Sequence, residues 1–350
     1  MGQRPSIAYV IDPRFPGGTS SAIAQELRVT SRMADVTVHA VASQMFSGTD
    51  IAPQLKRTLA DLGLNVIWDR PAIAADMVVI HNPTFLKFQK TWNARIIARQ
   101  VVVVTHENFL RPGRIEAFDV ASCLGLIDRC AFALRKTIAP ISAYNRRTVS
   151  DWLAQNPVCQ WNVLARDWFN ICDFPILAPN RSPRDRRGRH SRPGFEKFPA
   201  LEDMDRCFPD HAARNVILGG DTYLETGPQR PHWEIHSFRA IEIADYFAMI
   251  DFMVYFTAPT WRESFGRVLA EAIAAGKVVI SDAGTASAFG QAVVAAKPSE
   301  VDAIIGHFVA HPAEYRRHVL KAQARLADFS AQAFGKMLQE VLSAPVGVAA

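Results

Sequence analysis

The stretch that decides the fold reads Glu263-Ser-Phe-Gly-Arg-Val-Leu-Ala-Glu271-Ala-Ile-Ala-Ala-Gly-Lys-Val-Val-Ile280. Its two glutamates lie eight positions apart, with Gly266 between them. Eight residues of α-helix span about 12 Å and turn roughly 80° away from one face, so two helical carboxylates at this spacing could not bind the same atom. We therefore expect Glu263 in a loop, Glu271 within a helix, and a buried strand from Val278 to Ile280.

The start of this predicted helix is a candidate anion site. The first N–H groups of a helix have no partner within it, and those near Phe265 and Gly266 would be available to a ligand. Glu263 and Glu271 could then hold the two ends of an extended anionic ligand. The alternative is an ordinary alanine-rich helix with a capping glutamate.

Length and composition indicate a globular protein of two domains. The chain has 350 residues, of which 49% are hydrophobic and 21% charged, and domains of about 150–180 residues are a natural division. It contains no apolar run that approaches the roughly 18 residues of a membrane span, and its start lacks the apolar core of a signal peptide. The five cysteines form neither a zinc pattern nor an evident disulfide set, so we expect a reducing, cytoplasmic location.

The net charge of +5 is concentrated in one segment, residues 181–197. A diphosphate or an anionic membrane surface would attract such a cluster. Aromatic residues for base stacking are scarce there, apart from Phe195 and Phe198, so we do not expect nucleic acid as a partner.

The first half of the chain alternates between apolar runs and helical patterns. The predicted strands span residues 6–11, 36–42, 66–68, 77–80, 101–104 and 137–141, and predicted helices span 20–33 and 51–62. Uniformly apolar strands that alternate with helices are typical of a parallel sheet covered on both faces. The first half therefore predicts a Rossmann-like domain.

The second half begins with a break in this pattern. Residues 175–209 are rich in Arg, Pro, Asp and Gly and show little apolar periodicity. The alternation then resumes, with strands expected at 216–218, 252–256 and 278–281, helices around 237–245 and after Glu263, and a helical tail over 313–342. We expect a second Rossmann-like domain, a break near residue 165, and ligand binding at the carboxyl ends of the strands, in the cleft between domains.

Two groups near strand ends in the first half are candidate ligand contacts. Gly17 and Gly18 follow the first strand and would let the backbone and a helix start approach a ligand, although a tight turn capped by Thr19 or Ser20 explains them equally well. His106 ends the run 101–105, so its side chain should emerge at the carboxyl edge of the sheet.

His81 also ends a predicted strand. It is the weaker candidate of the two histidines, for the acceptor or the cleft wall. For a lone histidine such as His106, a structural role is the alternative.

The basic segment supplies a candidate phosphate clamp. Arg189 in Gly188-Arg189-His190-Ser191 and Lys197, eight positions further on, offer a bidentate fork and a point charge for a diphosphate. Arg192 could share or replace either role. The alternative is a solvated loop.

Taken together, these motifs resemble a known family. The string of acid, Ser-Phe-Gly, apolar turn, acid, alanine-rich turn, Gly276 and strand closely resembles the donor-binding signature of retaining GT-B glycosyltransferases, in particular the family-four group (glycosyl transferases group 1). The resemblance implies two Rossmann-like domains facing a central cleft. Residues 1–165 would form the acceptor side, 166–325 would bind the nucleotide-sugar donor, and 326–350 would form a helix that returns to the first domain.

The resemblance also implies roles for individual residues. Glu271 would hold the ribose hydroxyls, and Glu263 with the Ser264, Phe265 and Gly266 backbone would hold the sugar and phosphate.

The loop with Gly17 and Gly18 would close over the diphosphate and sugar. His106 would contact the sugar beside the reacting carbon. Arg189 and Lys197 match the Gly-Arg and Lys-Gly pair of the family, with two departures. Asp185-Arg186-Arg187 stands where an apolar strand is usual, and Phe198 replaces the second glycine. Arg192 remains a further candidate for the diphosphate. The expected catalytic set is His106, Arg189, Lys197 and Glu263.

Such enzymes work without a protein nucleophile, by positioning and charge stabilisation. We recognise no Asp-x-Asp motif of the metal-dependent class, the spacing of Asp203 and Asp205 aside, so we expect no metal and no cofactor beyond the nucleoside-diphosphate sugar. The acceptor would be a glycan, a lipid-linked glycan or a small molecule, in cell-surface polysaccharide biosynthesis. Alternatives are a nucleotide-sugar epimerase or phosphorylase on the same fold, or a non-catalytic protein that binds nucleotide sugars or nucleic acid.

Residues 85–97 mix aromatic and basic side chains at helical spacing. We expect a helix that packs its aromatic stripe on the sheet. The alternative is an interfacial helix that docks on anionic lipid, as a peripheral contact with the inner face of a membrane.

Overall fold

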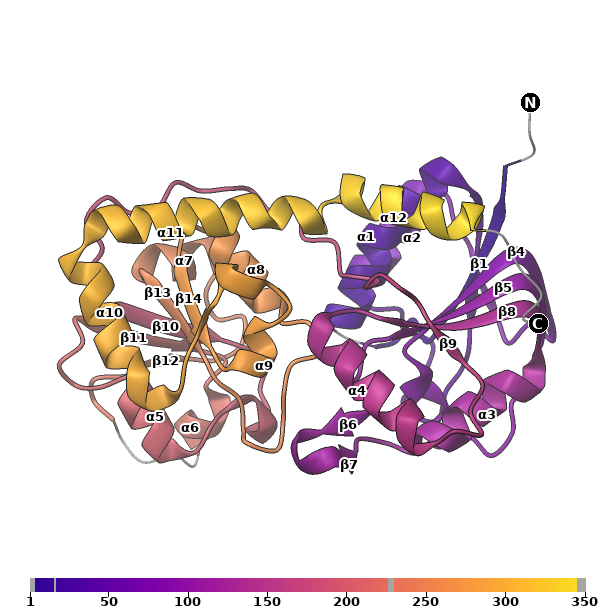
Figure 1. Cartoon of the computed structure of the whole chain (residues 1–350), viewed down its shortest axis with the longest axis horizontal. Coiled ribbons are helices and arrows are strands. Elements are labelled where there is room, and N and C mark those ends of the chain that lie inside the picture. The colour runs from indigo at the N-terminus through magenta and orange to yellow at the C-terminus, as the bar shows by residue number, and fades with distance from the viewer. Residues whose placement is uncertain (1–3, 16, 226–229, 345–350) are drawn as a thin grey trace. The chain divides into compact units, whose positions relative to one another are not determined.

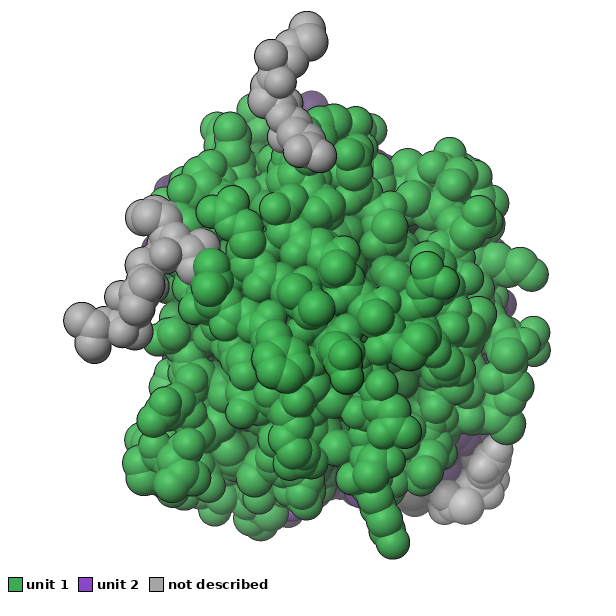
Figure 2. Space-filling model, turned by 90° about the vertical axis from the view of Figure 1, so that its right-hand side faces the viewer, with its two compact units in different colours: residues 1–171, 329–350 green, residues 172–328 purple. Residues whose placement is uncertain are grey.

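The computed structural model describes residues 4–15, 17–225 and 230–344. It divides into two compact units, the first formed by Met1–Ile171 with Phe329–Ala350 and the second by Cys172–Asp328. Figure 2 shows one face with unit 1 in green. The division after Ile171 lies slightly beyond the break that the sequence predicts near residue 165, and the last segment belongs to unit 1.

Unit 1 is built on a seven-stranded sheet in the order β3-β2-β1-β4-β5-β8-β9, in which every pair of neighbours is parallel (Figure 1). The strands are β1 (Ser6–Ile11), β2 (Asp35–Ala40), β3 (Val66–Trp68), β4 (Ala72–His81), β5 (Arg95–Thr105), β8 (Ala131–Pro140) and β9 (Asn162–Val163). A short antiparallel pair joins β6 (Leu110–Arg111) to β7 (Ile115–Glu116). The sheet confirms the predicted Rossmann-like architecture.

The helices of unit 1 are α1 (Gly18–Met33), α2 (Pro53–Leu62), α3 (Val120–Cys130), α4 (Ala143–Gln155) and α12 (Ala331–Ser343). Side-chain caps fix where three of them begin, with Asp119 before α3, Ser142 before α4 and Ser330 before α12. Helix α12 packs on α1, where a Cβ added to Gly335 would lie 3.6 Å from side-chain atoms of Val29 and Met33.

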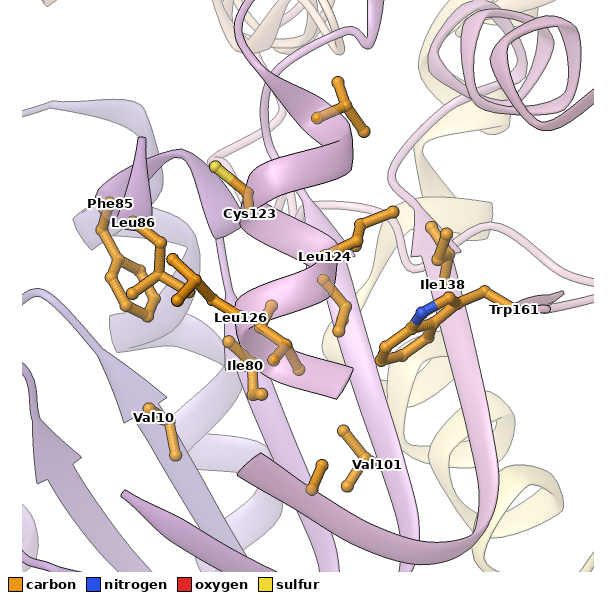
Figure 3. Packing of buried hydrophobic residues seen from close by; sticks show 14 of the residues in the cluster. Val10, Ile80, Phe85, Leu86, Val101, Cys123, Leu124, Leu126, Ile138 and Trp161 are labelled. Atoms are coloured by element: carbon orange, nitrogen blue, oxygen red, sulfur yellow. The ribbon is translucent and has the colours of Figure 1, made fainter. Parts of the chain in front are cut away.

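The core of unit 1 lies between its strands and helices. Val10, Ile80 and Val101 come from three neighbouring strands and are fully buried, and Leu124 and Leu126 of α3 belong to the same cluster (Figure 3). Burial of the strands on both faces accounts for their continuous apolar sequences.

The helix predicted over residues 85–97 is not formed. A 3-10 turn covers Pro83–Leu86, and strand β5 begins at Arg95. Phe85 is buried against the Trp92 ring, with 6.1 Å between ring centroids, while Phe88 is 55% exposed. Both helical interpretations were wrong, because the end of this segment pairs with β4 and β8 and the aromatic spacing reflects a turn that precedes a strand.

Unit 2 has a six-stranded sheet, again with parallel neighbours throughout, in the order β12-β11-β10-β13-β14-β15. The strands are β10 (Arg186–His190), β11 (Arg214–Leu218), β12 (Glu234–His236), β13 (Phe252–Tyr255), β14 (Val278–Ser281) and β15 (Val294–Ala295). The helices are α5 (Leu201–Cys207), α6 (Asp221–Glu225), α7 (Ile243–Met249), α8 (Arg267–Ala274), α9 (Ala283–Ala286), α10 (Val301–Ala310) and α11 (Pro312–Arg325).

The deciding stretch folds as predicted. Glu263 lies in the loop after β13, Glu271 lies within α8, and β14 pairs in parallel with β13 in the register Phe252↔Val278. Two other predicted helices have different bounds in the structure. The helix expected around residues 237–245 begins only at Ile243, and the expected helical tail is divided into α11 and α12 by a 3-10 turn at Leu326–Phe329.

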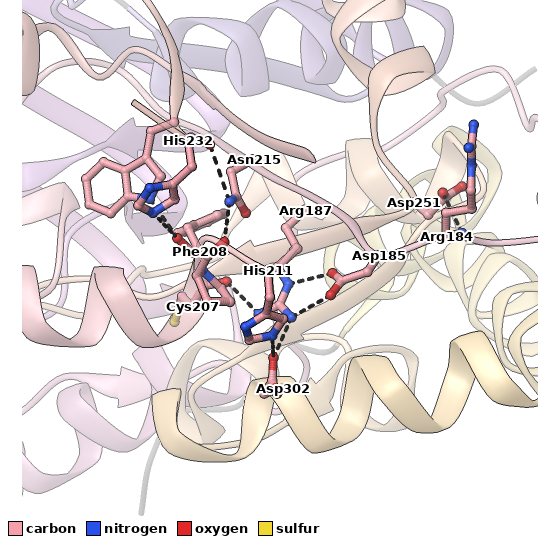
Figure 4. Close-up of polar contacts among 12 residues, drawn as sticks. Arg184, Asp185, Arg187, Cys207, Phe208, His211, Asn215, His232, Asp251 and Asp302 are labelled. Carbon is pink, nitrogen blue, oxygen red and sulfur yellow. Dashed lines mark hydrogen bonds and ion pairs between the residues drawn. The ribbon is translucent and has the colours of Figure 1, made fainter. Parts of the chain in front are cut away.

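The segment without apolar periodicity, residues 175–209, contains a central strand. β10, with the sequence Arg-Arg-Gly-Arg-His, lies third in the sheet. The buried Arg187 guanidinium donates to Asp185 and Asp302 at 2.6–2.8 Å and to the carbonyl of Cys207 at 3.1 Å (Figure 4). The solvated-loop alternative was therefore wrong, because the charges of this strand are neutralised inside the fold.

Candidate functional site

The strongest polar cluster of predicted site residues lies at the carboxyl edge of the sheet in unit 2. Tyr255 ends β13, Glu263 follows in the next loop, and Lys197 ends a 3-10 turn (Phe195–Lys197) after β10. Lys197 Nζ lies 2.6 Å from Glu263 Oε1, and the Tyr255 hydroxyl donates to the same oxygen at 2.6 Å. The Lys197 and Glu263 side chains are only 10% and 16% exposed.

The electrostatics of this cluster keep Glu263 ionised. Burial acts to raise the pKa of Glu263, but the charge and hydrogen bond of Lys197, the hydroxyl of Tyr255 and the charge of Arg192 outweigh it and lower that pKa below its ordinary value. Burial and the neighbouring Glu263 raise the pKa of Tyr255 well above its ordinary value, so this hydroxyl remains a donor. The Lys197 ammonium also lies 5.3 Å from the centre of the Trp261 ring.

The start of α8 has the form that an anion site requires. Gly266 occupies the N-cap with φ 82°, a left-handed conformation that favours glycine, and no side chain caps the helix within the part of the chain that the structure describes. Phe265 is buried with its ring against Phe289, at 5.3 Å between centroids. Ser264 lies in the loop between Glu263 and this N-cap.

Glu271 forms a second polar group at the same sheet edge. Its Oε1 accepts from Arg267 Nε at 3.2 Å, and its Oε2 lies 3.5 Å from Nε2 of His190, the last residue of β10. That nitrogen is buried and makes no hydrogen bond to any described residue. Burial raises the pKa of Glu271, against the pull of Arg267.

His190 and Tyr255 are contacts that sequence reasoning missed. Burial and the charge of Arg189 lower the pKa of His190 to about 4, so its ring is neutral at neutral pH. Each residue is the last one of its strand, a position that could have identified Tyr255. His190 was hidden because β10 does not look like a strand.

Arg189 requires a correction. It was expected to contact a diphosphate, but its side chain is 1% exposed and its guanidinium lies 4.0 Å from the centre of the Phe198 ring and 5.2 Å from that of Tyr255. It donates to the carbonyl oxygens of Phe256, at 3.1 Å, and Lys197. Arg189 therefore supports the loop that carries Lys197 and does not present its charge to a ligand.

Arg192 has an exposed guanidinium and lies between β10 and Lys197. Its side chain is 56% exposed and lies 2.8 Å from Glu196. Its charge contributes to the lowered pKa of Glu263, which places the two groups within electrostatic reach.

The glycines predicted for unit 1 lie at an exposed helix start. Gly17 is the N-cap of α1 with φ 89°, and a Cβ added to Gly17 or Gly18 would meet nothing within 4 Å. Only Gly17 needs glycine for its backbone conformation. Capping by Thr19 or Ser20 was the wrong alternative, since no side chain caps this described helix start and the Ser20 hydroxyl donates to Phe15.

The two histidines of unit 1 are in contact. His106 follows β5, and its Nε2 lies 2.9 Å from Nδ1 of His81, the last residue of β4. His81 is buried and His106 half-buried. Burial and the neighbouring His81 lower the pKa of His106 well below its ordinary value, so the His106 ring is neutral at neutral pH. The sequence predicted both as strand-end residues but not their contact.

One group of described side chains has ligand atoms close enough to hold a metal ion, namely Asp185, His211 and Asp302, within 4.8 Å of one another. The Arg187 guanidinium already donates to both carboxylates (Figure 4). Asp185 precedes the first residue of β10, so this cluster lies at the amino end of that strand, opposite to Lys197. It is a structural ion-pair network.

In the described residues we find no helix with the length and apolar character needed to cross a membrane. No family model matches the sequence, and no curated protein matches it.

Solved structures do resemble the chain. HepE of Anabaena in complex with UDP is 16% identical, with a TM-score of 0.65 over 97% of this chain and 99% of that one. Trehalose-6-phosphate from E. coli bound with UDP-2-fluoro glucose is 12% identical (TM-score 0.61, 96% and 98% covered). Sucrose-phosphate synthase from Thermosynechococcus elongatus is 13% identical (TM-score 0.61, 97% and 98% covered). At these identities the likeness establishes the fold, and this chain has the GT-B fold with two Rossmann-like units.

Proposed function

We propose that the chain is a retaining glycosyltransferase, related to the family-four group, that moves a sugar from a nucleoside-diphosphate sugar to a glycan, a lipid-linked glycan or a small acceptor. The observation that carries the proposal is the Lys197–Glu263–Tyr255 cluster, at the carboxyl edge of a parallel sheet and immediately before the uncapped start of α8. HepE binds UDP-glucose on the same fold. UDP-sugars are therefore the first donors to test.

Different residues of unit 2 would bind different parts of the donor. Glu271 and His190, whose Oε2 and Nε2 lie 3.5 Å apart, would take the ribose hydroxyls. Lys197 and Arg192 would neutralise the diphosphate, with the first amides of α8. Arg189 would hold the Lys197 loop in place.

The chemistry follows from where charge develops. The bond between the anomeric carbon and the β-phosphate oxygen breaks, and the acceptor oxygen bonds to that carbon on the same face. The acceptor proton passes to the departing phosphate, whose growing negative charge Lys197 and Arg192 would stabilise. Glu263 would bind the sugar, and His106 and the Gly17–Gly18 loop would contribute from unit 1. This scheme requires no metal and no protein nucleophile.

The test is calorimetric titration of the full chain with UDP, GDP and ADP, with and without EDTA. We expect one nucleotide to bind independently of metal, and Glu271→Ala to abolish that binding. Glu314→Ala is a matched control, because Glu314 is a partly exposed glutamate of unit 2 that forms ion pairs with His307 and Arg317. Folded protein that binds none of the three nucleotides would refute the proposal.

Product analysis with UDP-glucose separates the rival enzymes. Transfer to an acceptor supports the glycosyltransferase, an isomerised sugar would indicate an epimerase, and cleavage that depends on phosphate would indicate a phosphorylase. Salt-sensitive binding to RNA or DNA, without nucleotide binding, would instead favour the nucleic-acid alternative.

We propose only the broad class of acceptor, namely a glycan, a lipid-linked glycan or a small molecule. A role in cell-surface polysaccharide biosynthesis follows from the family resemblance. The proposed peripheral membrane contact loses its predicted basis, since residues 85–97 form a turn and the start of β5 and no amphipathic helix. Sedimentation with anionic vesicles tests it directly.

A further inference from the structure

A buried carboxylate in unit 1 gathers three donors. Glu26 lies on α1 and is 4% exposed. Its Oε1 accepts from the Tyr9 hydroxyl at 2.9 Å and lies 3.3 Å from His81 Nε2, while its Oε2 accepts from Trp168 Nε1 at 3.0 Å. Such an acid is fully satisfied as an acceptor at both oxygens.

The Glu26 carboxylate determines which ring nitrogen of His81 carries the hydrogen. Because the oxygen facing His81 Nε2 accepts, that nitrogen carries the hydrogen, and in a neutral ring Nδ1 then holds a lone pair. Nδ1 of His81 lies 2.9 Å from Nε2 of His106. The hydrogen shared by the two rings must therefore come from His106. The ring of His106 is then left with an accepting Nδ1.

We propose that Glu26 and His81 are positioning residues that hold His106 in the tautomer with its hydrogen on Nε2, so that Nδ1 accepts a hydrogen bond from a ligand hydroxyl. His106 is half-buried, and His81 is its one side-chain hydrogen-bond partner among the described residues. An accepting nitrogen selects hydroxyl groups over phosphate or carboxylate oxygens, which only accept. That this hydroxyl belongs to the donor or acceptor sugar rests on the proposed function.

Glu26→Gln should reverse the direction of the chain of hydrogen bonds. The indole of Trp168 can only donate, so the amide oxygen must face it and the amide NH2 must face Tyr9 and His81. Tyr9 can accept, because its own hydrogen can turn to Thr30 Oγ1, 2.8 Å away. His81 can accept only by moving its hydrogen to Nδ1, which then donates to His106. His106 becomes the Nδ1–H tautomer.

The experiment is nuclear magnetic resonance of the full chain with 15N-labelled histidine rings, since the shift of each ring nitrogen shows whether it carries hydrogen. His81→Gln and His106→Gln assign the signals. We expect Nε2–H at both rings in the wild type and Nδ1–H at both in Glu26→Gln. Adding Trp168→Phe to Glu26→Gln frees the amide to turn over and should restore Nε2–H.

Two results would overturn the proposal: Nδ1–H at His106 in the wild type, or unchanged tautomers in folded Glu26→Gln. The wild-type spectrum decides the first even if the variant does not fold. The side-chain contacts of Glu26 are all with residues of unit 1, whereas the proposed nucleotide contacts belong to unit 2. Glu26→Gln should therefore bind UDP as the wild type does, and absent UDP binding would count against the proposed function alone.

UDP release from UDP-glucose tests the link to a ligand. It should fall about tenfold in Glu26→Gln, the size of one lost hydrogen bond, and recover in the double variant. Unchanged release in a variant whose tautomers have switched would overturn the role of Nδ1 toward the ligand.

Discussion

β1 of unit 1 and β10 of unit 2 occupy the same place, third in a parallel sheet with a parallel neighbour on each side. β1 reads Ser-Ile-Ala-Tyr-Val-Ile and is buried through apolar side chains, whereas β10 reads Arg-Arg-Gly-Arg-His and is buried just as deeply. In β10, Arg187 is neutralised by carboxylates and Arg189 is enclosed by aromatic rings. Burial therefore depends on partners far along the chain as well as on hydropathy.

The loops after these two strands differ as well. After β1, Asp12 and Arg14 neutralise each other in a buried pair at 2.8 Å, with side chains 0% and 5% exposed. After β10, Lys197 finds its carboxylate, Glu263, in a different loop. The charges after β1 thus neutralise each other within one loop. Those after β10 pair between two loops at a sheet edge, where a ligand could compete for them.

The largest expected effect is on turnover. Lys197→Ala removes the charge that would stabilise the departing phosphate and leaves Glu263 without its cation, so UDP release from UDP-glucose should fall about 10²–10³-fold. Lys321→Ala removes an exposed lysine of the same unit that bonds Gln291, and should leave the rate unchanged. Equal rates in both variants would show that Lys197, in the loop after β10, has no role in turnover.

The same substitution at two arginines sharpens the distinction between structure and function. Arg189→Met leaves the carbonyls of Lys197 and Phe256 without their donor, and should lower the free energy of unfolding by about 3 kcal/mol. Arg192→Met, at an exposed position, should lower UDP affinity with little change in stability. Urea melts and calorimetry measure both. If Arg189→Met unfolds like the wild type but loses UDP binding, our placement of Arg189 is wrong.

A methyl group tests how tightly β10 is packed. In Gly188→Ala the added Cβ would lie 2.7 Å from both Ile250 Cγ2 and Tyr246 Oη, so we expect a loss of about 2 kcal/mol from overpacking. Gly306→Ala, within α10, meets nothing within 4 Å and should add up to about 1 kcal/mol through helix propensity. Thermal melts of the pair should move in opposite directions.

Near neutral pH the smallest effect is a pH dependence that β1, with no group titrating in this range, cannot produce. His190 has a folded pKa of about 4, below the unfolded value of about 6.5. Between these values the unfolded chain binds the extra proton, so stability is complete above pH 6.5 and falls toward pH 4, by up to about 1.4 kcal/mol per pH unit. His190→Gln should flatten this part of the curve, and an unaltered slope would contradict the buried position.

The parts of the fold that could be predicted are those whose own side chains are apolar and therefore indicate burial. β1, β3 and β14 lie where their apolar runs placed them, and the loop–helix–strand unit after Glu263 is confirmed. β10 could not be predicted, because Asp302, which helps to neutralise it, lies more than a hundred positions away.

The same reason limited the candidate site. Glu263, Glu271 and Lys197 lie at the expected sheet edge, and their roles stay predictions. The contacts of His190 and Tyr255 depend on which strands end side by side. A strand order is a property of the folded sheet and not of any local motif.

The division of the chain has a consequence for its synthesis. Unit 2 is one continuous segment, whereas unit 1 is formed by two, and its last helix α12 packs Phe334 against Trp168 and lies beside α1. On the ribosome, the segment that comes second can complete its fold first, while the segment made first stays unfinished until the final helix emerges. Until α12 has been made, the surface of unit 1 that it covers is thus open to chaperones, and a premature stop between unit 2 and α12 would leave unit 2 whole and unit 1 incomplete.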